Sequence, residues 1–305
     1  MADPKVSTIV LNWNNAPDTE KCITSLLEQD YKNIDIVVVD NGSTDGSDKT
    51  LKQRFGGVRN IELIFLEKNT GFAEGNNIGI RRALEQRTDC VFILNNDVVV
   101  TPRCISTLVQ VAESDGHIGI VGATNLFADD TQRIWHSGGT RNWGRKRFFD
   151  DTANILYDPN DQRIRDVDCV VGSSMLVKKA VIEKVGLMWA PYFLCFEEMD
   201  WCLRAKKSGF RVVAAMGAVV YHKVHASLNK TLEYYYLNRN YPIFMLRNCP
   251  PLDMPKAILF YLIGIPIEYI KLLISRDKER AAVLWHAHVD FLLHRYGERK
   301  FRKSY

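Results

Sequence analysis

The sequence predicts an α/β fold in which a Rossmann-like, mostly parallel sheet has helices on both faces and is followed by a C-terminal helical extension. Short runs rich in Val and Ile, such as 34–39 and 90–94, lack polar alternation, as is typical of strands buried on both faces of a parallel sheet. Helically spaced apolar residues fill the segments between these runs, and this alternation indicates βαβ units. The 305 residues suffice for one large domain or two smaller ones, at ~150 residues per domain.

Each element follows from its own apolar pattern. In the N-terminal part we expect strands at 6–11, 34–39, 61–66 and 90–94, with helices at 19–28, 47–54 and 75–84 between them. Later elements are strands at 169–171, 175–177 and 211–220, a helix at 178–185 and a helix that ends near Gly209. Residues 127–168 have no regular pattern, and we interpret them as an insertion near the functional site or, equally, as a solvated face.

Composition excludes several classes of protein. The chain has 40 Lys and Arg against 36 Asp and Glu, and its net charge of +4 is too small for a protein that binds nucleic acid. Its 7 cysteines are scattered singly, without a CxxC pair, which argues against a zinc site or a disulfide framework and favours a reducing compartment. The N-terminal apolar stretch is short enough to be a strand and does not resemble a signal peptide. We therefore expect a cytoplasmic protein.

Small and polar residues follow each of the first four predicted strands. These loops are NWNN at 12–15, DNGSTDG at 40–46, NTGFAEGNN at 69–77 and NND at 95–97. Turns favour Asn, Asp and Gly in general, but four such loops in succession are harder to explain as turns alone. In a doubly wound sheet the ligand binds at the carboxyl ends of the strands. The sequence therefore predicts a polar ligand site at that edge.

Carboxylates in these loops suggest the chemistry of the site. Asp97 ends an apolar strand beside two amides, and hard divalent cations accept such oxygen ligands when diphosphate oxygens supply the rest. Asp40 stands where a carboxylate can hold a base or a ribose. Glu197, Glu198 and Asp200 place three acids within four positions, which would raise the pKa of at least one and suit it to general base catalysis. Alternatively, these acids simply favour the dipole at a helix start.

Taken together, the motifs resemble those of glycosyltransferase family 2, and more narrowly its rhamnosyltransferase-like branch. The resemblance covers about residues 5–250 and rests on an ordered set of motifs: residues 6–14, VVVDNGSTDGS at 37–47, NTGFAEGNN at 69–77, LNND at 94–97 and FEEMDWCLR at 196–204. It implies a GT-A fold, an inverting single displacement, and Mg²⁺ or Mn²⁺ bridging the diphosphate of a nucleotide sugar.

The resemblance also implies roles for particular residues. Asp97 and His222 would bind the metal, although Asn95 replaces the first acid of the family's DXD motif and leaves the site with one charge fewer. Glu198 would be the catalytic base, with Asp200 as its rival. Asp40 would contact the nucleotide base. The other expected donor-binding residues are Asn12, Asn41, Ser43, Asn69, Gly71, Asn76, Asn96 and Arg204.

From these motifs we expect a nucleotide-binding half at about 1–100 and an acceptor half at about 101–228, together forming one GT-A domain, with a helical extension at 229–305. The expected function is transfer of a sugar, with L-rhamnose as first choice, from dTDP-rhamnose or a UDP-sugar to a saccharide acceptor in cell-surface polysaccharide synthesis. A non-catalytic nucleotide-sugar-binding module and a nucleotidyltransferase are the alternatives. The latter would be expected to have a glycine-rich basic loop after the first strand, where this chain has NWNN.

The C-terminal extension contains an apolar run at 258–267 that Glu268 ends and Pro266 interrupts. The run is shorter than the ~20 residues that a membrane span requires. Because basic residues surround it, we expect an in-plane position at the inner face of the cytoplasmic membrane, with a lipid-linked acceptor. A helix packed on the core of the domain is the alternative, and a homo-oligomer is left open. The basic neighbours are Lys256, Lys271, Arg276, Lys278 and Arg280.

Overall fold

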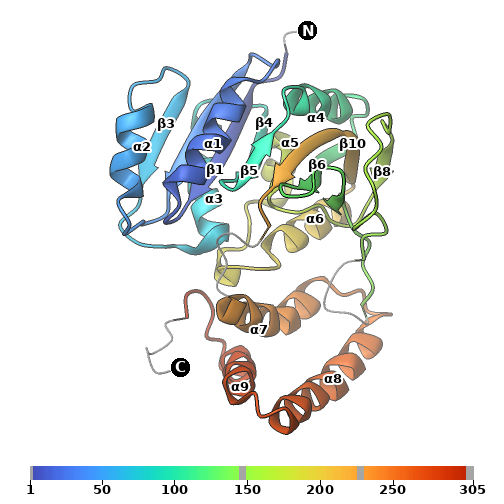
Figure 1. Cartoon of the computed structure of the whole chain (residues 1–305). Coiled ribbons are helices and arrows are strands. Elements are labelled where there is room, and N and C mark those ends of the chain that lie inside the picture. Colours follow the sequence, from blue (N-terminus) through green and yellow to red (C-terminus); the bar gives the residue numbers. More distant parts are fainter. Residues whose placement is uncertain (1–2, 144–148, 225–229, 300–305) are drawn as a thin grey trace.

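The computed structural model describes residues 3–143, 149–224 and 230–299. A sheet with helices on both faces forms the larger body, and three C-terminal helices form a smaller body below it (Figure 1). The expected boundary between the two, at 228, lies outside the described residues. Because the chain enters β1 at the top of Figure 1, the parallel strands end on the side that faces the smaller body.

The N-terminal half of the sheet has the predicted strands and the predicted direction. The order β3-β2-β1-β4 is built from parallel pairs throughout. Each strand agrees with its expected range to within one residue, and three of them extend by one residue into the polar loop that follows. The strands are β1 (Val6–Asn12), β2 (Ile34–Asp40), β3 (Ile61–Phe65) and β4 (Cys90–Asn95).

The other half of the sheet is mixed. β9 (Ser174–Lys178) pairs antiparallel with β4 on one side and with β6 (Ile118–Phe127) on the other, so β6 and β10 (Arg211–His222) run in the direction of β4. The edges carry three short strands: β5 (Val98–Val100), β7 (Ile134–His136) and β8 (Ile164–Asp166). In direction, the sheet is therefore mostly parallel, as predicted, with an antiparallel strand at its centre.

The strand expected at 169–171 does not form. Cys169 makes only an isolated bridge to Gly139, and the side chain of Val170 lies against Gly122 of β6. A Cβ added at Gly122 would lie 2.5 Å from the Val170 side chain, so Val170 packs on the backbone of Gly122 without joining a ladder. The apolar pattern here reflects burial and not strand pairing.

Helices cover both faces of the sheet and enclose two hydrophobic cores. One core lies beneath α1 (Ala16–Leu27), α2 (Ser47–Phe55) and α4 (Cys104–Glu113). The other lies beneath α3 (Gly71–Glu85), α5 (Lys179–Val185) and α6 (Glu197–Lys207). Both α1 and α3 begin earlier than predicted, by three and four residues, because the polar loops pass directly into the helices.

The smaller body consists of α7 (Lys230–Asn248), α8 (Met254–Ile274) and α9 (Lys278–Leu292). The expectation that its apolar run is too short to span a membrane is wrong, since the run is the middle of a continuous helix of 21 residues. By length and composition alone, α8 is able to cross a membrane. Pro266 lies inside the helix without ending it, and Glu268 accepts a 2.7 Å hydrogen bond from Tyr234 Oη instead of breaking the helix. Because Ala257 is its one buried residue, α8 is not a core helix either.

Candidate active site

A buried hydrogen-bond network fixes the Asp40 carboxylate at the end of β2. Asn12 Nδ2 donates to Asp40 Oδ2 at 2.6 Å and to Ser43 Oγ at 3.2 Å, and the backbone N–H of Ser43 donates to Asp40 Oδ1 at 3.0 Å. Asp40 is 2% exposed and Asn12 is fully buried. Asn12 therefore orients Asp40 from the protein interior, while Ser43, in the loop after β2, lies nearer to solvent.

Asn96 extends this network from the end of β4. Its Nδ2 donates to Asn12 Oδ1 at 3.2 Å and to Thr19 Oγ1 at 2.9 Å, and Thr19 Oγ1 itself donates to Asn12 Oδ1 at 2.7 Å. Asn96 is buried. The amides of Asn12 and Asn96 thus join the ends of β1, β2 and β4 into one rigid edge. Thr19 was missed by the sequence analysis, since a single Thr in an amphipathic helix carries no signal of its own.

The loop after β3 is held by a second pair of amides. Asn41 Nδ2 donates to Asn69 Oδ1 at 3.1 Å and to the carbonyl of Gly71 at 3.2 Å, and Asn69 Oδ1 also accepts from the backbone N–H of Gly71. Gly71 has a φ of +86°, and a Cβ at this position would lie 2.5 Å from the carbonyl oxygen of Phe193. Asn76 is fully buried, and its Nδ2 donates to the carbonyl of Phe72. The predicted donor loop therefore packs directly on the loop that leads into α6.

Asp97 and His222 meet where β4 and β10 end. His222 Nε2 lies 3.2 Å from Asp97 Oδ1, and each side chain is 7% exposed. The pairing of β10 with β5 brings them together, because His222 is in register with Val98. The ring of Trp135, from β7, contacts the His222 ring edge to face at 4.6 Å. Part of the 127–168 insertion therefore does lie at the site, while residues 144–148 of it lie outside the described residues.

The Asp97–His222 pair can supply part of the ligand set of a divalent metal. Within residues 3–143, 149–224 and 230–299, no group of three or more His, Cys, Asp or Glu side chains is placed to hold a metal alone. His222 Nδ1, however, is buried without a hydrogen-bond partner in this part of the chain. A carboxylate beside an imidazole, at the edge where a diphosphate is expected, is a suitable partial ligand set for Mg²⁺ or Mn²⁺.

The three acids at the start of α6 lie in different environments. Burial raises the pKa of Glu198 from 4.5 to about 7. Glu197 is more deeply buried, and its pKa is raised well above the usual range. Burial is the larger cause and the negative charge of Glu198 the second. A Cβ at Gly172 would lie 3.5 Å from Glu198 Cβ, so Glu198 adjoins the loop that precedes β9. Glu198 is the half-buried acid whose pKa suits proton exchange near neutral pH.

Asp200 is instead the centre of a buried ion-pair network. Its carboxylate lies 2.7 Å from Arg204 Nε and 3.1 Å from Arg247 Nε, and accepts a 2.8 Å hydrogen bond from Asn248. Burial alone would raise the pKa of Asp200, but these partners outweigh it and hold the pKa below the usual value. Because Arg247 and Asn248 belong to α7, this network joins α6 to the helical body.

Arg204 does not have the environment expected of a donor-binding residue. Besides Asp200, its guanidinium donates to the carbonyl oxygens of Val185 and Leu187. All three of its nitrogens are therefore engaged within the protein. The geometry makes Arg204 a structural partner of Asp200, and we do not propose a donor contact for it.

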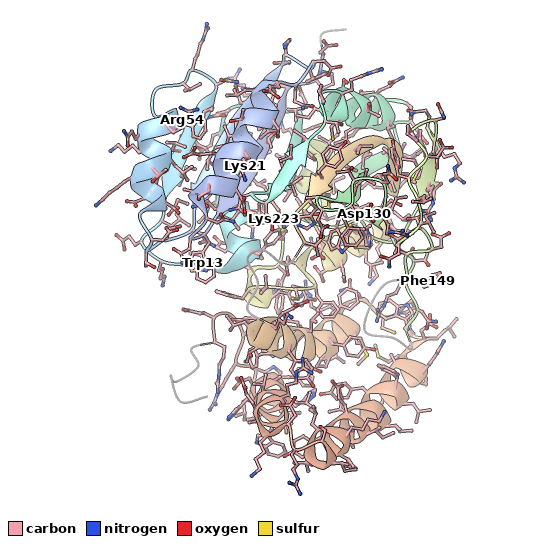
Figure 2. All side chains as sticks on the ribbon, in the orientation of Figure 1. Trp13, Lys21, Arg54, Asp130, Phe149 and Lys223 are labelled. Carbon is pink, nitrogen blue, oxygen red and sulfur yellow. The ribbon has the colours of Figure 1, made fainter. Side chains whose placement is uncertain are left out.

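Two further residues of the site gave no signal in the sequence. Asn125, in the buried strand β6, accepts from Ser173 Oγ at 2.9 Å and from Ser174 Oγ at 3.1 Å. Lys223 Nζ lies 3.0 Å from Asp18 Oδ2, and its backbone N–H donates to the carbonyl of Asp97. Figure 2 shows Lys223 and Trp13 in the lower part of the sheet body, toward the helices. Lys223 lies beside Asp97 because β5 pairs with β10, and the sequence analysis predicted neither β5 nor this pairing.

The fold and the site together define a GT-A enzyme that acts on a nucleotide-activated sugar. Residues 7–185 match the sequence model of Glycosyl transferase family 2, and the chain belongs to this family. It is a glycosyltransferase. The sequence-based prediction of family and fold is thereby confirmed.

Curated relatives include rhamnosyltransferases. The dTDP-rhamnosyl transferase RfbF of Shigella flexneri is 23% identical over 269 residues, which are 85% of this chain and 86% of the relative. The N-acetylglucosaminyl-diphospho-decaprenol L-rhamnosyltransferase of Mycobacterium tuberculosis is 25% identical over 242 residues, which are 72% of this chain and 76% of the relative.

Solved structures resemble the fold at lower sequence identity. The mannosyltransferase PcManGT from Pyrobaculum calidifontis, in complex with GDP-Man and Mn²⁺, aligns with a TM-score of 0.59 at 16% identity over 95% of this chain and 88% of its own. GalNAc-T7 with UDP, GalNAc and Mn²⁺ aligns with a TM-score of 0.63 at 12% identity over 80% of this chain. This chain covers 48% of the GalNAc-T7 chain. At such identities the likeness shows the fold alone.

Proposed function

We propose that the protein transfers L-rhamnose, with inversion, from dTDP-rhamnose to a hydroxyl of a lipid-linked saccharide in cell-surface polysaccharide synthesis. One observation carries the proposed chemistry: the loop that adjoins Glu198, an acid whose pKa is raised to about 7, is bonded to the end of β4, where Asp97 and His222 form a pair suited to a metal. The bond runs from the backbone N–H of Asn95 to the carbonyl of Ser173, at 3.0 Å. The activities named for the Shigella and Mycobacterium relatives support the choice of rhamnose as the sugar and of a lipid-linked acceptor. A UDP-sugar is the second choice of donor.

The proposed reaction is a single displacement. Glu198 accepts the proton of the acceptor hydroxyl while its oxygen bonds to the anomeric carbon. The bond from that carbon to the diphosphate oxygen breaks on the opposite face, and the electron pair leaves with the nucleoside diphosphate. A base with a pKa near the working pH is effective because it is deprotonated often enough to act and basic enough to take the proton. Glu198 meets this condition better than Asp200, whose carboxylate is neutralised by two arginines.

Asp97 and His222 would hold a divalent cation together with the donor diphosphate. When bound, such a cation stabilises the charge that develops on the leaving diphosphate, which is worth several kcal/mol. Asp40 would accept a hydrogen bond from the nucleotide base, since Asn12 and the Ser43 N–H already hold its carboxylate in one orientation. Asn41, Asn69, Gly71 and Asn76 would shape the wall of the same pocket through the hydrogen bonds that join their loops.

A thermal-shift screen followed by a transfer assay tests this proposal. We expect dTDP-rhamnose with Mn²⁺ to raise the melting temperature more than UDP-sugars or GDP-mannose do, because a ligand bound only to the folded state stabilises it by mass action. Rhamnose should then pass to a diphosphate-linked saccharide acceptor, and the product should have the inverted anomeric configuration. Binding of the donor without transfer or hydrolysis would make the chain a nucleotide-sugar-binding module. If another nucleotide sugar causes a larger rise in melting temperature, that nucleotide sugar is the donor instead of dTDP-rhamnose.

A further inference from the structure

The C-terminal body presents an apolar surface that the fold leaves uncovered. We infer that this surface docks α8 in the plane of an anionic lipid bilayer. Its members are 42–77% exposed, whereas side chains of these types are normally buried. We call this surface the α8 outer face; it consists of Ile258, Leu259, Leu262, Ile263, Ile267, Ile270, Leu273 and Ile274.

The α8 outer face is a continuous stripe along one side of the helix. Each of its residues has another member three or four positions away, the spacing that places side chains on one face of an α-helix. The single acid within α8, Glu268, points away from the stripe, toward Tyr234 of α7, whose Oη donates to it at 2.7 Å. The exposed side is therefore apolar over the full length of the helix without an intervening negative charge.

Basic and aromatic side chains border the α8 outer face. Exposed lysines lie near its two ends, Lys256 in the first turn and Lys271 in the last. In the C-terminal half of α8, Tyr269 lines a groove between α8 and α9 together with Lys278 and Trp285 of α9. Trp285 is 59% exposed, and Trp and Tyr favour the headgroup level of a bilayer because one part of each ring system is apolar and the other polar. This combination matches an anionic membrane surface, which attracts the nearby cations.

The fold argues against a transmembrane position for α8, although its length permits one. A helix of 21 residues is about 31 Å long, so a membrane-spanning α8 would place its two ends on opposite sides of the bilayer. Yet α7, before it, and α9, after it, pack on each other, and Tyr235 Oη of α7 donates to Asp290 Oδ2 of α9 at 2.7 Å. The inner side of α8 is bound to α9 as well, through the 2.8 Å hydrogen bond between Tyr261 Oη and His288 Nδ1. An in-plane position keeps all of these contacts.

A second copy of the chain fits the surface less well than lipid does. A two-fold contact through α8 would bring the basic border of one copy close to that of the other. Asp277 lies 3.8 Å from Arg280 Nε and offsets that cation, but Lys256 and Lys271 of one copy would still face those of the other. Like charges that face each other oppose association, whereas anionic headgroups attract the same border.

Vesicle flotation of the full chain tests the inference. We expect the protein to float with vesicles of phosphatidylcholine and phosphatidylglycerol at low salt, and much less with phosphatidylcholine alone or at high salt. The double variant Leu259→Gln/Leu262→Gln should lose at least about tenfold in vesicle affinity, because it withdraws two apolar side chains from the bilayer. Lys271→Gln should weaken binding to the anionic vesicles several-fold and leave binding to neutral ones unchanged, by loss of one surface cation.

The matched control is Leu27→Gln/Phe65→Gln, which replaces two apolar side chains, 44% and 41% exposed, on the sheet body. Flotation of this control should equal that of the wild type. Failure of the wild type to float, or equal flotation of both double variants, would overturn the inference. A wild type that sediments as a dimer and becomes a monomer only in Leu259→Gln/Leu262→Gln would overturn it too, and would make the surface a subunit interface. Donor-induced thermal shifts of every variant should match the wild type, which keeps this test independent of the proposed function.

Discussion

His222 Nε2 lies 3.2 Å from Asp97 Oδ1, although 125 positions separate the two residues in the sequence. The contact depends on the antiparallel pairing of β5 with β10, which brings the residue directly before β5 beside the last residue of β10. Trp135 packs on the imidazole from β7. The register between strands therefore brings the two metal-binding candidates together. Because they belong to separate segments of the chain, each can be replaced without altering the other.

Replacing Asp97 with Asn should remove the metal-dependent part of donor binding. The amide has nearly the shape of the carboxylate but lacks the charge that a divalent cation requires. We expect the thermal shift caused by dTDP with Mn²⁺ to fall to the value obtained with dTDP and EDTA, while the shift in EDTA stays as in the wild type. His222→Gln should behave similarly, with a smaller loss. An unchanged Mn²⁺-dependent shift in Asp97→Asn would place the metal elsewhere.

Replacing Glu198 with Gln should reduce turnover by ~10²–10⁴-fold with little change in donor affinity, since the amide cannot accept a proton. In the wild type, kcat should rise with pH and level off above about 7, because burial raises the pKa of this acid to about 7 and only its deprotonated form acts as a base. Initial rates between pH 5 and 9 provide the measurement. A profile that is flat across this range would argue against Glu198.

The pH dependence of the unfolding free energy should also reflect the raised pKa of Glu198. Because the pKa of Glu198 rises from 4.5 to about 7 on folding, the folded chain retains a proton that the unfolded chain releases between these values. The contribution of this group to stability is therefore greatest below pH 4.5 and declines as the pH rises to about 7. Glu198→Gln should remove that decline, so the difference in unfolding free energy between variant and wild type should favour the variant more at pH 8 than at pH 5. Urea unfolding at the two pH values measures this, and a pH-independent difference would contradict it.

Asp200→Asn should act mainly on stability. The substitution leaves Arg204 and Arg247 without their shared carboxylate, and breaking a buried ion pair costs about 3–5 kcal/mol. Since both arginines are partly exposed, solvent reduces this, and we expect a loss of about 2–3 kcal/mol in urea unfolding. Turnover per folded molecule should fall far less than in Glu198→Gln. The reverse pattern, with stability unchanged and turnover abolished, would identify Asp200 as the base.

Much of this fold is encoded locally, and that part could be predicted. The buried runs of β1, β2 and β4 and the amphipathic helices between them are each specified by a short stretch of sequence, as are the polar loops at their ends. Right-handed βαβ connections then require those loops to share one edge. The motifs at Asp40 and Asp97 lie in or beside such loops, which is why their positions could be read from the sequence, whereas Glu198 was found through the cluster of acids that begins α6.

The remaining features depend on long-range packing. Whether Glu198 or Asp200 suits proton transfer depends on Arg247 and Asn248, which come from a helix some 47–48 residues further on. The antiparallel insertion of β9 and the contact of Trp135 with His222 likewise follow from how separate segments meet. The true length of α8 was missed because Glu268 looks like a stop until its partner on α7, Tyr234, is known.

Gly71 provides the last test, because it joins the predicted donor loop to the loop that precedes the proposed base. Its φ of +86° disfavours any side chain, and a Cβ there would also lie 2.5 Å from the backbone oxygen of Phe193, which accepts a 2.7 Å hydrogen bond from the Phe72 N–H. Gly71→Ala must therefore both strain the backbone and push the two loops apart. We expect it to destabilise the protein by about 2–4 kcal/mol, of which backbone strain accounts for 1–2.

Gly57→Ala is the matched control, since Gly57 has a φ of +95° but nothing within 4 Å of its added Cβ. It should lose only the strain component, about 1–2 kcal/mol, and bind the donor normally. Gly71→Ala should in addition weaken donor binding about tenfold, which corresponds to 1.4 kcal/mol of binding free energy. Urea unfolding and calorimetric titration with dTDP and Mn²⁺ distinguish the two variants. If both lose the same stability and bind dTDP equally well, the contact between Gly71 and Phe193 does not shape the donor site.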